Sequence, residues 1–162
     1  MVLRRFAIDV VKVAVRAHNT AVRGVLQAFK GREVKHTGDG IMATLPNPVA
    51  AVQATIRMQR EIAAHNSANP SIEVTIRIGL NAGEAVEEDN GFFSAAVQMT
   101  ARICDKASKG NIWLSQAVKG ACKGQKIGFI PRGQFEMKGI QGAEPLYEIG
   151  WSDSHKNEIA DL

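Results

Sequence analysis

Apolar residues recur three or four positions apart in three long stretches of the chain, which predicts three amphipathic helices. These stretches run from Val10 to Phe29, from Pro48 to about His65 and from about Phe92 to Ala107. Asn47 precedes the second stretch and Pro48 opens it, the usual order of a capping side chain and a first-turn proline. We therefore expect Asn47 to cap this helix.

A period of two predicts strands elsewhere in the chain. From Ile72 to Leu80, apolar residues alternate with polar residues or glycine, as in a strand with one buried face. Shorter strand-like runs cover Glu33–Thr37, Ile41–Leu45 and Ile112–Leu114, and Ile127–Ile149 is typical of further strands joined by turns. This order of elements predicts an α+β domain with helices on one side of an antiparallel sheet.

Two short motifs lie between these elements, one a turn and the other a helix cap. Gly38-Asp39-Gly40 lies between two strand-like runs, which predicts a tight β-hairpin. Lys35 precedes Asp39 by four residues, so one rigid hairpin carries a cation and an anion that a charged ligand could span. Asp is also an ordinary turn residue, and the pattern alone leaves both interpretations open. Further along, Ser115 is placed to cap a short helix that ends near Cys122.

The third predicted helix carries polar residues at helical spacing. Gln98 and Arg102 are four residues apart and therefore neighbours on one face. Arg102 is also three residues from Asp105, so a surface ion pair is the alternative to a functional role. The acidic residues between Glu84 and Gly91 suggest either a metal site or a solvated loop, and we favour the loop.

The amino-acid composition limits the classes of protein to which the chain can belong. The chain has 162 residues, of which 45% are hydrophobic, which suits one domain with one core. No run approaches the ~18 apolar residues of a membrane helix, and the start lacks a signal-peptide pattern, so we expect no membrane contact and a cytoplasmic location. Cys104 and Cys122 lack the spacing of metal ligands and the density of a disulfide framework, which indicates buried thiols.

The net charge of +4 and the isoelectric point of about 9.3 are compatible with an anionic partner. The basic residues are scattered along the chain, however, so we expect local phosphate contacts and no nucleic-acid partner. Aromatic residues make up only 6% of the chain and no Gly-Phe-x-Phe motif occurs, which disfavours single-stranded RNA binding on a sheet.

The hairpin motif Lys-x-x-Gly-Asp, followed by Ile41-Met42-Ala43, resembles the central hairpin of class III nucleotidyl cyclase catalytic domains. The resemblance covers about residues 9–150, and several separated motifs in the family's order make it specific. The other motifs are Arg16-Ala17-His18-Asn19, Gly31-Arg32-Glu33-Val34, Arg77 to Glu84, Val97 to Ile103, Met137-Lys138-Gly139 and Pro145 to Glu148.

The resemblance implies a ferredoxin-like antiparallel sheet and an intracellular signalling enzyme of adenylate type. Such enzymes convert ATP to 3′,5′-cyclic AMP and pyrophosphate by attack of the 3′-hydroxyl on the α-phosphate, assisted by two Mg²⁺ or Mn²⁺ ions. The resemblance also implies a head-to-tail homodimer in which both copies contribute residues to each active site.

The same resemblance implies roles for individual residues. Asp39 matches the second of two metal carboxylates, and Lys35 matches the cation that reads adenine, where guanylate cyclases have Glu. Arg102 matches the arginine that stabilises transition-state charge. Gln98 takes the place of the asparagine that orients the ribose, and Gly91 takes the place of the adenine-reading aspartate.

Lys138 matches the lysine that binds the triphosphate. The alternative is a solvated lysine beside a glycine turn.

The first-strand motif of the family, aromatic-x-Asp-Ile-x-Gly with the first metal carboxylate, has no clear counterpart here. The resemblance implies a shortened N-terminus, so we expect the first strand to be missing. Phe6-Ala7-Ile8-Asp9 is superficially similar, but it lies too close to Gly31 for the usual intervening helix. We therefore expect Asp9 to be an exposed residue and not a metal ligand.

Two hypotheses follow. The first is an adenylate-type cyclase domain over residues 1–150 with a polar C-terminal tail over 151–162, in which the missing aspartate weakens turnover. The second is a degenerate cyclase-like module that dimerises or binds nucleotide without turnover.

Overall fold

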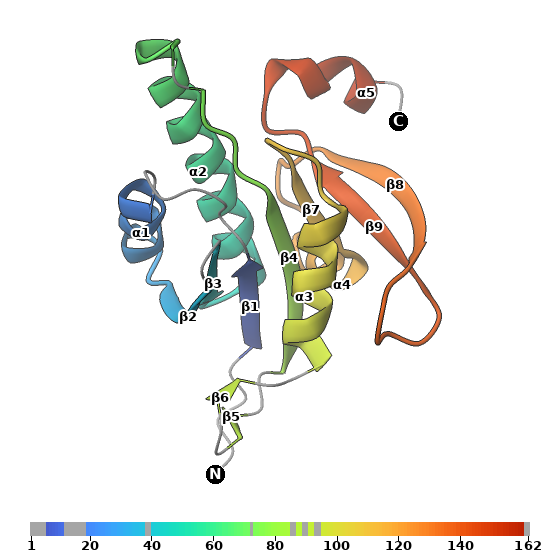
Figure 1. Cartoon of the computed structure of the whole chain (residues 1–162). Helices are drawn as coiled ribbons and strands as arrows, with labels where there is room; N and C mark the ends of the chain where they lie inside the picture. Colours follow the sequence, from blue (N-terminus) through green and yellow to red (C-terminus); the bar gives the residue numbers. More distant parts are fainter. Residues whose placement is uncertain are drawn as a thin grey trace.

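The computed structural model describes residues 6–11, 19–37, 40–71, 73–84, 87–88, 91–92 and 95–160. Within this part of the chain, seven strands form one sheet in the order β2-β3-β1-β4-β7-β9-β8 (Figure 1). Neighbouring strands run antiparallel, except for the parallel pair β4–β7. The strands are β1 Phe6–Val11, β2 Arg32–Thr37, β3 Gly40–Leu45, β4 Ile78–Glu84, β7 Ile112–Ser115, β8 Phe129–Glu136 and β9 Ala143–Ile149.

A short antiparallel pair, β5 Glu87–Glu88 and β6 Gly91–Phe92, stands apart from this sheet. The helices are α1 Asn19–Ala28, α2 Pro48–Ala68, α3 Ala95–Lys106, α4 Gln116–Ala121, the 3-10 helix η1 Asp153–His155 and α5 Lys156–Ala160. The fold is therefore α+β, as predicted from the order of elements.

Both predicted helix caps are confirmed. The amide N–H of Ala50 donates to Asn47 Oδ1 over 2.8 Å at the start of α2. The amide N–H of Val118 donates to Ser115 Oγ over 3.5 Å at the start of α4. These side chains supply acceptors for amide groups that have no partner within the helix.

Helices cover both faces of the sheet, which differs from the expectation of one face. Ile78, Leu80, Ile112 and Leu114 join the core cluster formed with α1, α2 and α4. The intervening Trp113 belongs to a second cluster that contains Ile103 and Ala107 at the C-terminal end of α3. Because successive side chains of a strand point to opposite faces, α3 lies on the face away from α1 and α2.

The first strand is present, and the expectation that it is missing is wrong. Strand β1 lies between β3 and β4, and Asp9 pairs with Thr44 on one side and with Asn81 on the other. The sequence pattern predicts a helix from Val10, whereas helix α1 of the structure begins at Asn19. A short apolar run is compatible with either element, and pairing with two neighbouring strands decides for the strand.

Strand β4 begins six residues later than the alternating pattern predicts. Val74 is held by a side chain: its amide N–H donates to Asn66 Oδ1 over 2.9 Å, and its carbonyl oxygen accepts from Asn66 Nδ2 over 2.7 Å. An asparagine side chain that satisfies both backbone groups removes their need for a neighbouring strand. The sheet pairing therefore starts only at Ile78.

Residues 151–160, which the polar pattern favours as a tail, form η1 and α5 and pack against the sheet. The division of the chain into a domain and a tail at residue 150 stays a prediction.

The contact between β4 and α3 gives a test of this packing. A Cβ at Gly79 would lie 2.5 Å from the backbone nitrogen of Cys104, so Gly79→Ala forces the helix away from the strand. We expect a loss of about 1–3 kcal/mol in the free energy of unfolding, measured by urea denaturation. Gly24→Ala is the matched control, because a Cβ at Gly24 in α1 meets nothing within 4 Å. This control should gain about 0.5–1 kcal/mol, and equal losses in both variants would contradict the close packing.

Candidate functional site

Helix α3 carries two of the predicted site residues, Gln98 and Arg102. They are four residues apart, so their Cα atoms are separated by about 6 Å along the helix axis. Gln98 is exposed, and the Arg102 side chain is 41% exposed. The first turn of α3 begins at Ala95, after strand β6, so Gly91 lies outside this helix and pairs with Glu88.

Arg102 forms the surface ion pair that its spacing predicts. Its Nη1 atom lies 3.7 Å from Asp105 Oδ2, one helical turn away, and both side chains are more than two-fifths exposed. Exposed pairs of this kind contribute only ~0–1 kcal/mol. The guanidinium therefore remains accessible to an anionic ligand.

The structure brings the loop after β8 next to α3. Lys138 lies in this loop between β8 and β9, and its side chain is exposed. The following residue, Gly139, has φ of +81°, and a Cβ built there would lie 3.9 Å from Gln98 Oε1. Gln98 and Gly139, about forty positions apart in the sequence, thus lie near one another, and Lys138 directly precedes Gly139.

A pocket of about 400 Å³ opens beside Gln98. It lies between α3, the end of β4, the start of α4 and the loop after β8. None of the described residues that line it is Lys or Arg, and Glu144 contributes a carboxylate. A phosphate group is therefore disfavoured inside the pocket and favoured near Arg102 and Lys138 outside its lining. The polar lining residues are Asn81, Gln98, Ser115, Gln116, Gln141 and Glu144.

No pattern in the sequence selects Glu144 or Gln141. Gln141 lies in the loop between β8 and β9, and Glu144 is the second residue of β9, so both follow Lys138 by at most six positions. Asn81 is likewise a new site residue: it is 5% exposed and its Nδ2 donates to the carbonyl oxygen of Ala96 over 3.2 Å. It holds the first turn of α3 against β4.

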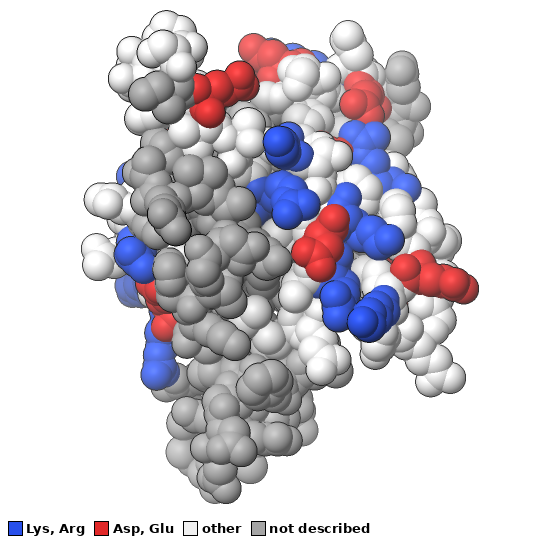
Figure 2. Space-filling model, viewed as in Figure 1, with Lys and Arg blue, Asp and Glu red and all other residues white. Residues whose placement is uncertain are grey.

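Positive charge gathers on this face of the molecule. Figure 2 shows Lys and Arg side chains over the region where Figure 1 places α3 and the β8–β9 hairpin, with a few acidic side chains between them. Arg102 and Lys106 on α3 and Lys138 after β8 are among the cations of these elements. A surface potential of this sign attracts an anion such as a triphosphate.

The predicted hairpin is confirmed by the antiparallel pairing of β2 and β3, in which Thr37 pairs with Gly40. Lys35 pairs with Met42 through the backbone, and its side chain lies outside the described part of the structure. Gly38 and Asp39 also lie outside the described residues, so their predicted roles stay predictions.

The backbone register bears on the metal ligands that the resemblance implies. Asp9 pairs with Thr44, whereas Gly40, the neighbour of Asp39 in sequence, begins the same strand β3 four residues earlier. The side chain of Asp9, and Asp39 as a whole, lie outside the described residues, so the metal ligand predicted at Asp39 stays a prediction. Among the described residues, no three His, Cys, Asp or Glu side chains are grouped for a metal ion.

Nothing in the described helices is both long and apolar enough to cross a membrane. The two cysteines are buried thiols, as predicted, and burial raises the pKa of the Cys122 thiol, which disfavours the reactive thiolate.

Comparisons with known proteins agree with the architecture. The chain is 31% identical over 125 residues to "Putative adenylate cyclase 3" of Rhizobium meliloti (strain 1021), a match over 76% of this chain and 21% of that protein. The chain thus spans about a fifth of the length of this relative.

Two solved structures share the fold at low sequence identity. One is an adenylate cyclase of Trypanosoma brucei in its monomeric state, with a TM-score of 0.80, 14% identity and coverage of 92% of this chain and 91% of that chain. The other is an adenylate/guanylate cyclase/hydrolase from Silicibacter pomeroyi, with a TM-score of 0.80, 21% identity and coverage of 91% and 98%.

Residues 3–150 match the family described as "Adenylate and Guanylate cyclase catalytic domain", which is nearly the whole chain. Together with the curated relative and the shared α+β fold, this match shows that the chain belongs to the adenylate and guanylate cyclase catalytic domain family.

Proposed function

We propose that this chain binds ATP and converts it to 3′,5′-cyclic AMP and pyrophosphate. The observation that supports the proposal is that Gln98 on α3 and Gly139 after β8 line the same pocket, since Lys138 precedes Gly139 and Arg102 follows Gln98 by about one helical turn. In this proposal, one copy of the chain offers the Gln98 amide and the cations of Arg102 and Lys138 to the same ligand. An amide beside two cations suits a ribose that is linked to a triphosphate.

In the proposed reaction, the ribose 3′-oxygen attacks the α-phosphorus and gives its proton to a solvent water. The bond from this phosphorus to the oxygen bridging to the β-phosphate breaks, and pyrophosphate leaves with the electron pair of that bond. Gln98 orients the ribose through its amide. Arg102 stabilises the negative charge that develops on the transferred phosphate, and Lys138 binds the triphosphate as a point charge. Asp39 would hold a divalent ion, Mg²⁺ or Mn²⁺, which would lower the pKa of the attacking hydroxyl and offset negative charge on the phosphates.

The proposed assembly is a head-to-tail homodimer in which Arg102 of one copy completes a site that holds Lys35 and Asp39 of the other. The exposure of the Arg102 side chain is compatible with use by a second copy. Lys35 favours ATP over GTP in this proposal, since it replaces the Glu of guanylate cyclases, and the relative in Rhizobium meliloti carries an adenylate cyclase name.

A second candidate function is nucleotide binding without turnover. The lack of a clear counterpart to the family's first metal carboxylate in the sequence favours it, because the second metal position then has no anchor. Both candidates require the same cations for the triphosphate. They differ only in whether cyclic AMP forms.

The Arg102→Ala variant tests the proposal. Purified protein is incubated with ATP and Mn²⁺, and cyclic AMP is quantified by mass spectrometry while ATP affinity is measured by calorimetry. We expect kcat to fall by about 10²- to 10³-fold, because one donor to a developing charge is lost. Arg57→Ala is the matched control, since Arg57 forms an exposed ion pair with Glu61 on α2, and it should leave kcat unchanged.

Three outcomes separate the two functions. Cyclic AMP formation that depends on Arg102 supports the cyclase. ATP binding that weakens in Lys138→Ala, without cyclic AMP from the unmodified chain, supports the binding module. No ATP binding by the unmodified chain at millimolar concentration contradicts both.

The choice of base is tested by Lys35→Glu. A carboxylate at this position removes the cation proposed to read adenine and offers an acceptor to the amino group of guanine. We expect the ratio of ATP to GTP affinity to fall by about tenfold or more, as for one charged hydrogen bond of ~1.5–3 kcal/mol. The affinities are measured by competition with a fluorescent nucleotide. An unchanged ratio of ATP to GTP affinity would show that the base of the nucleotide does not contact Lys35 on β2.

A further inference from the structure

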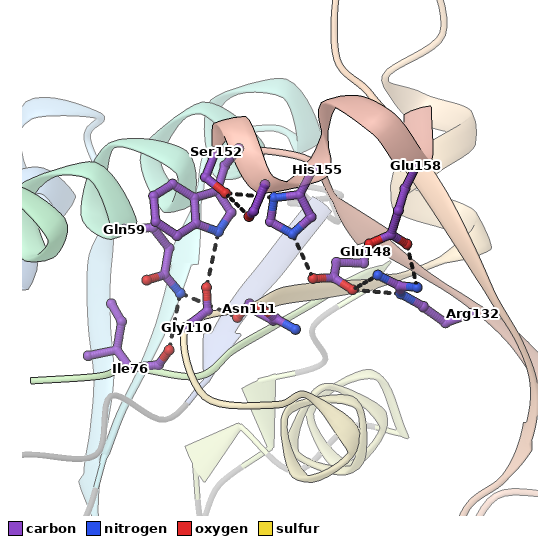
Figure 3. A network of polar contacts seen from close by, with 11 residues as sticks. Gln59, Ile76, Gly110, Asn111, Arg132, Glu148, Ser152, His155 and Glu158 are labelled. Carbon is purple, nitrogen blue, oxygen red and sulfur yellow. Dashed lines mark hydrogen bonds and ion pairs between the residues drawn. The ribbon is translucent and has the colours of Figure 1, made fainter. Parts of the chain in front are cut away.

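The segment that follows the matched family region is attached to the domain at several points. We call residues 151–160 the C-terminal strap. It contributes Trp151, His155, Glu158 and Ile159 to contacts with the sheet and with the loop after α3. Figure 3 shows these polar contacts converging from the strap, β8, β9 and the loop at Gly110 and Asn111.

Two paired glycines form a seat for the strap. The amide N–H of Gly150 donates to the carbonyl oxygen of Gly128 over 2.9 Å, at the end of β9 and the start of β8. A Cβ at either glycine would overlap Cδ1 of Ile159. The absence of side chains at these two positions is therefore what allows Ile159 to lie against the sheet.

A buried carboxylate couples the strap to β8. Glu148 on β9 is 1% exposed, and its two oxygens are divided between Arg132 at 2.6 Å and His155 Nε2 at 3.0 Å. Arg132 also reaches Glu158 in α5 at 2.9 Å. Burial of a carboxylate is costly unless its hydrogen bonds are satisfied. Undocking of the strap removes one of the two partners of Glu148, so the state of the strap and the position of Arg132 are linked.

The strap also holds the loop that ends α3. Trp151 Nε1 donates to the carbonyl oxygen of Gly110 over 3.0 Å, and the same loop is held from the other side by Gln59 of α2, whose Nε2 donates to the carbonyl oxygen of Asn111 over 3.3 Å. Helix α3 carries Arg102, and β8 leads to Lys138. One short segment thus contacts the loop that follows α3 and strand β8, and these lead to Arg102 and to Lys138, the proposed phosphate-binding cations.

We propose that the C-terminal strap is a regulatory element that fixes α3 and β8 relative to one another, so that its release loosens the nucleotide site. Docked, the strap joins the α3 end loop through Trp151 and β8 through Arg132 and Glu148. Released, it frees both contacts at once and exposes the glycine seat. The effect on the nucleotide rests on the proposed function, but the mechanical coupling does not.

The test compares Ile159→Asp with Asn157→Asp in the full chain. Both changes add one carboxylate to α5, but Asn157 is exposed, whereas Ile159 occupies the glycine seat. Hydrogen exchange is followed by mass spectrometry. In Ile159→Asp we expect exchange to rise about tenfold in residues 151–160, in 107–111 and in 129–138, while peptides of α1 and α2 keep their protection. Asn157→Asp and the conservative Ile159→Val should match the unmodified chain.

Faster exchange confined to residues 151–160 would overturn the coupling. Faster exchange in every peptide would show only that the domain unfolds, and Glu158→Ala then decides. This change removes one partly exposed ion pair with Arg132 and leaves the core intact. In this variant a smaller rise in 129–138 supports the proposal, and an unchanged rate contradicts it.

A nucleotide measurement separates this inference from the proposed function. If the chain binds ATP, Ile159→Asp should weaken binding by about threefold to tenfold, and unchanged affinity overturns the regulatory role. If the unmodified chain does not bind ATP, the proposed function fails, and the exchange data alone then support or overturn the coupling of the strap to α3 and β8.

Discussion

The close approach of helix α3 to strand β4 is the constraint on which the candidate site depends. Gly79 and Gly83 leave no side chain between the strand and the helix, so a Cβ at either would meet Cys104 or Ala96. Asn81, between these glycines, donates to the carbonyl oxygen of Ala96, and Thr100 Oγ1 donates to the same oxygen over 2.7 Å. A helix held this way has little freedom to slide or rotate. The face of α3 that carries Gln98 and Arg102 is therefore fixed in position relative to the sheet.

Patterns of nearby residues predicted the parts of the fold that depend on short-range interactions along the chain. The caps at Asn47 and Ser115, the antiparallel hairpin of β2 and β3, and the helical spacing of Gln98 and Arg102 follow from neighbours within about four residues in the sequence. The family was recognised from separated motifs, and its catalytic-domain match covers residues 3–150. The position of Gln98 and Arg102 on one helix was therefore predictable before the tertiary structure.

Contacts between distant segments decided what the sequence did not predict. Phe6–Val11 is a central strand because β3 and β4 both pair with it. The sequence of so short an apolar run does not reveal whether such partners exist. The meeting of Gln98 with Gly139, and the seat of Ile159 on Gly128 and Gly150, join segments that the sequence separates by up to about forty residues. Helical and strand periods give the face of each element, but they do not say which face of the sheet a helix will cover.

Arg132 and Arg102 differ in how strongly their carboxylate partners hold them. Arg132 is tied to Glu148, which is almost fully buried, and breaking such a pair leaves an uncompensated charge that typically costs ~3–5 kcal/mol. Arg102 shares only an exposed contact with Asp105, worth ~0–1 kcal/mol. A triphosphate can therefore displace the partner of Arg102 at little cost but not the partners of Arg132. The same difference makes Arg132 suited to respond to docking or release of the C-terminal strap. The position of its guanidinium depends on the positions of Glu148 and Glu158.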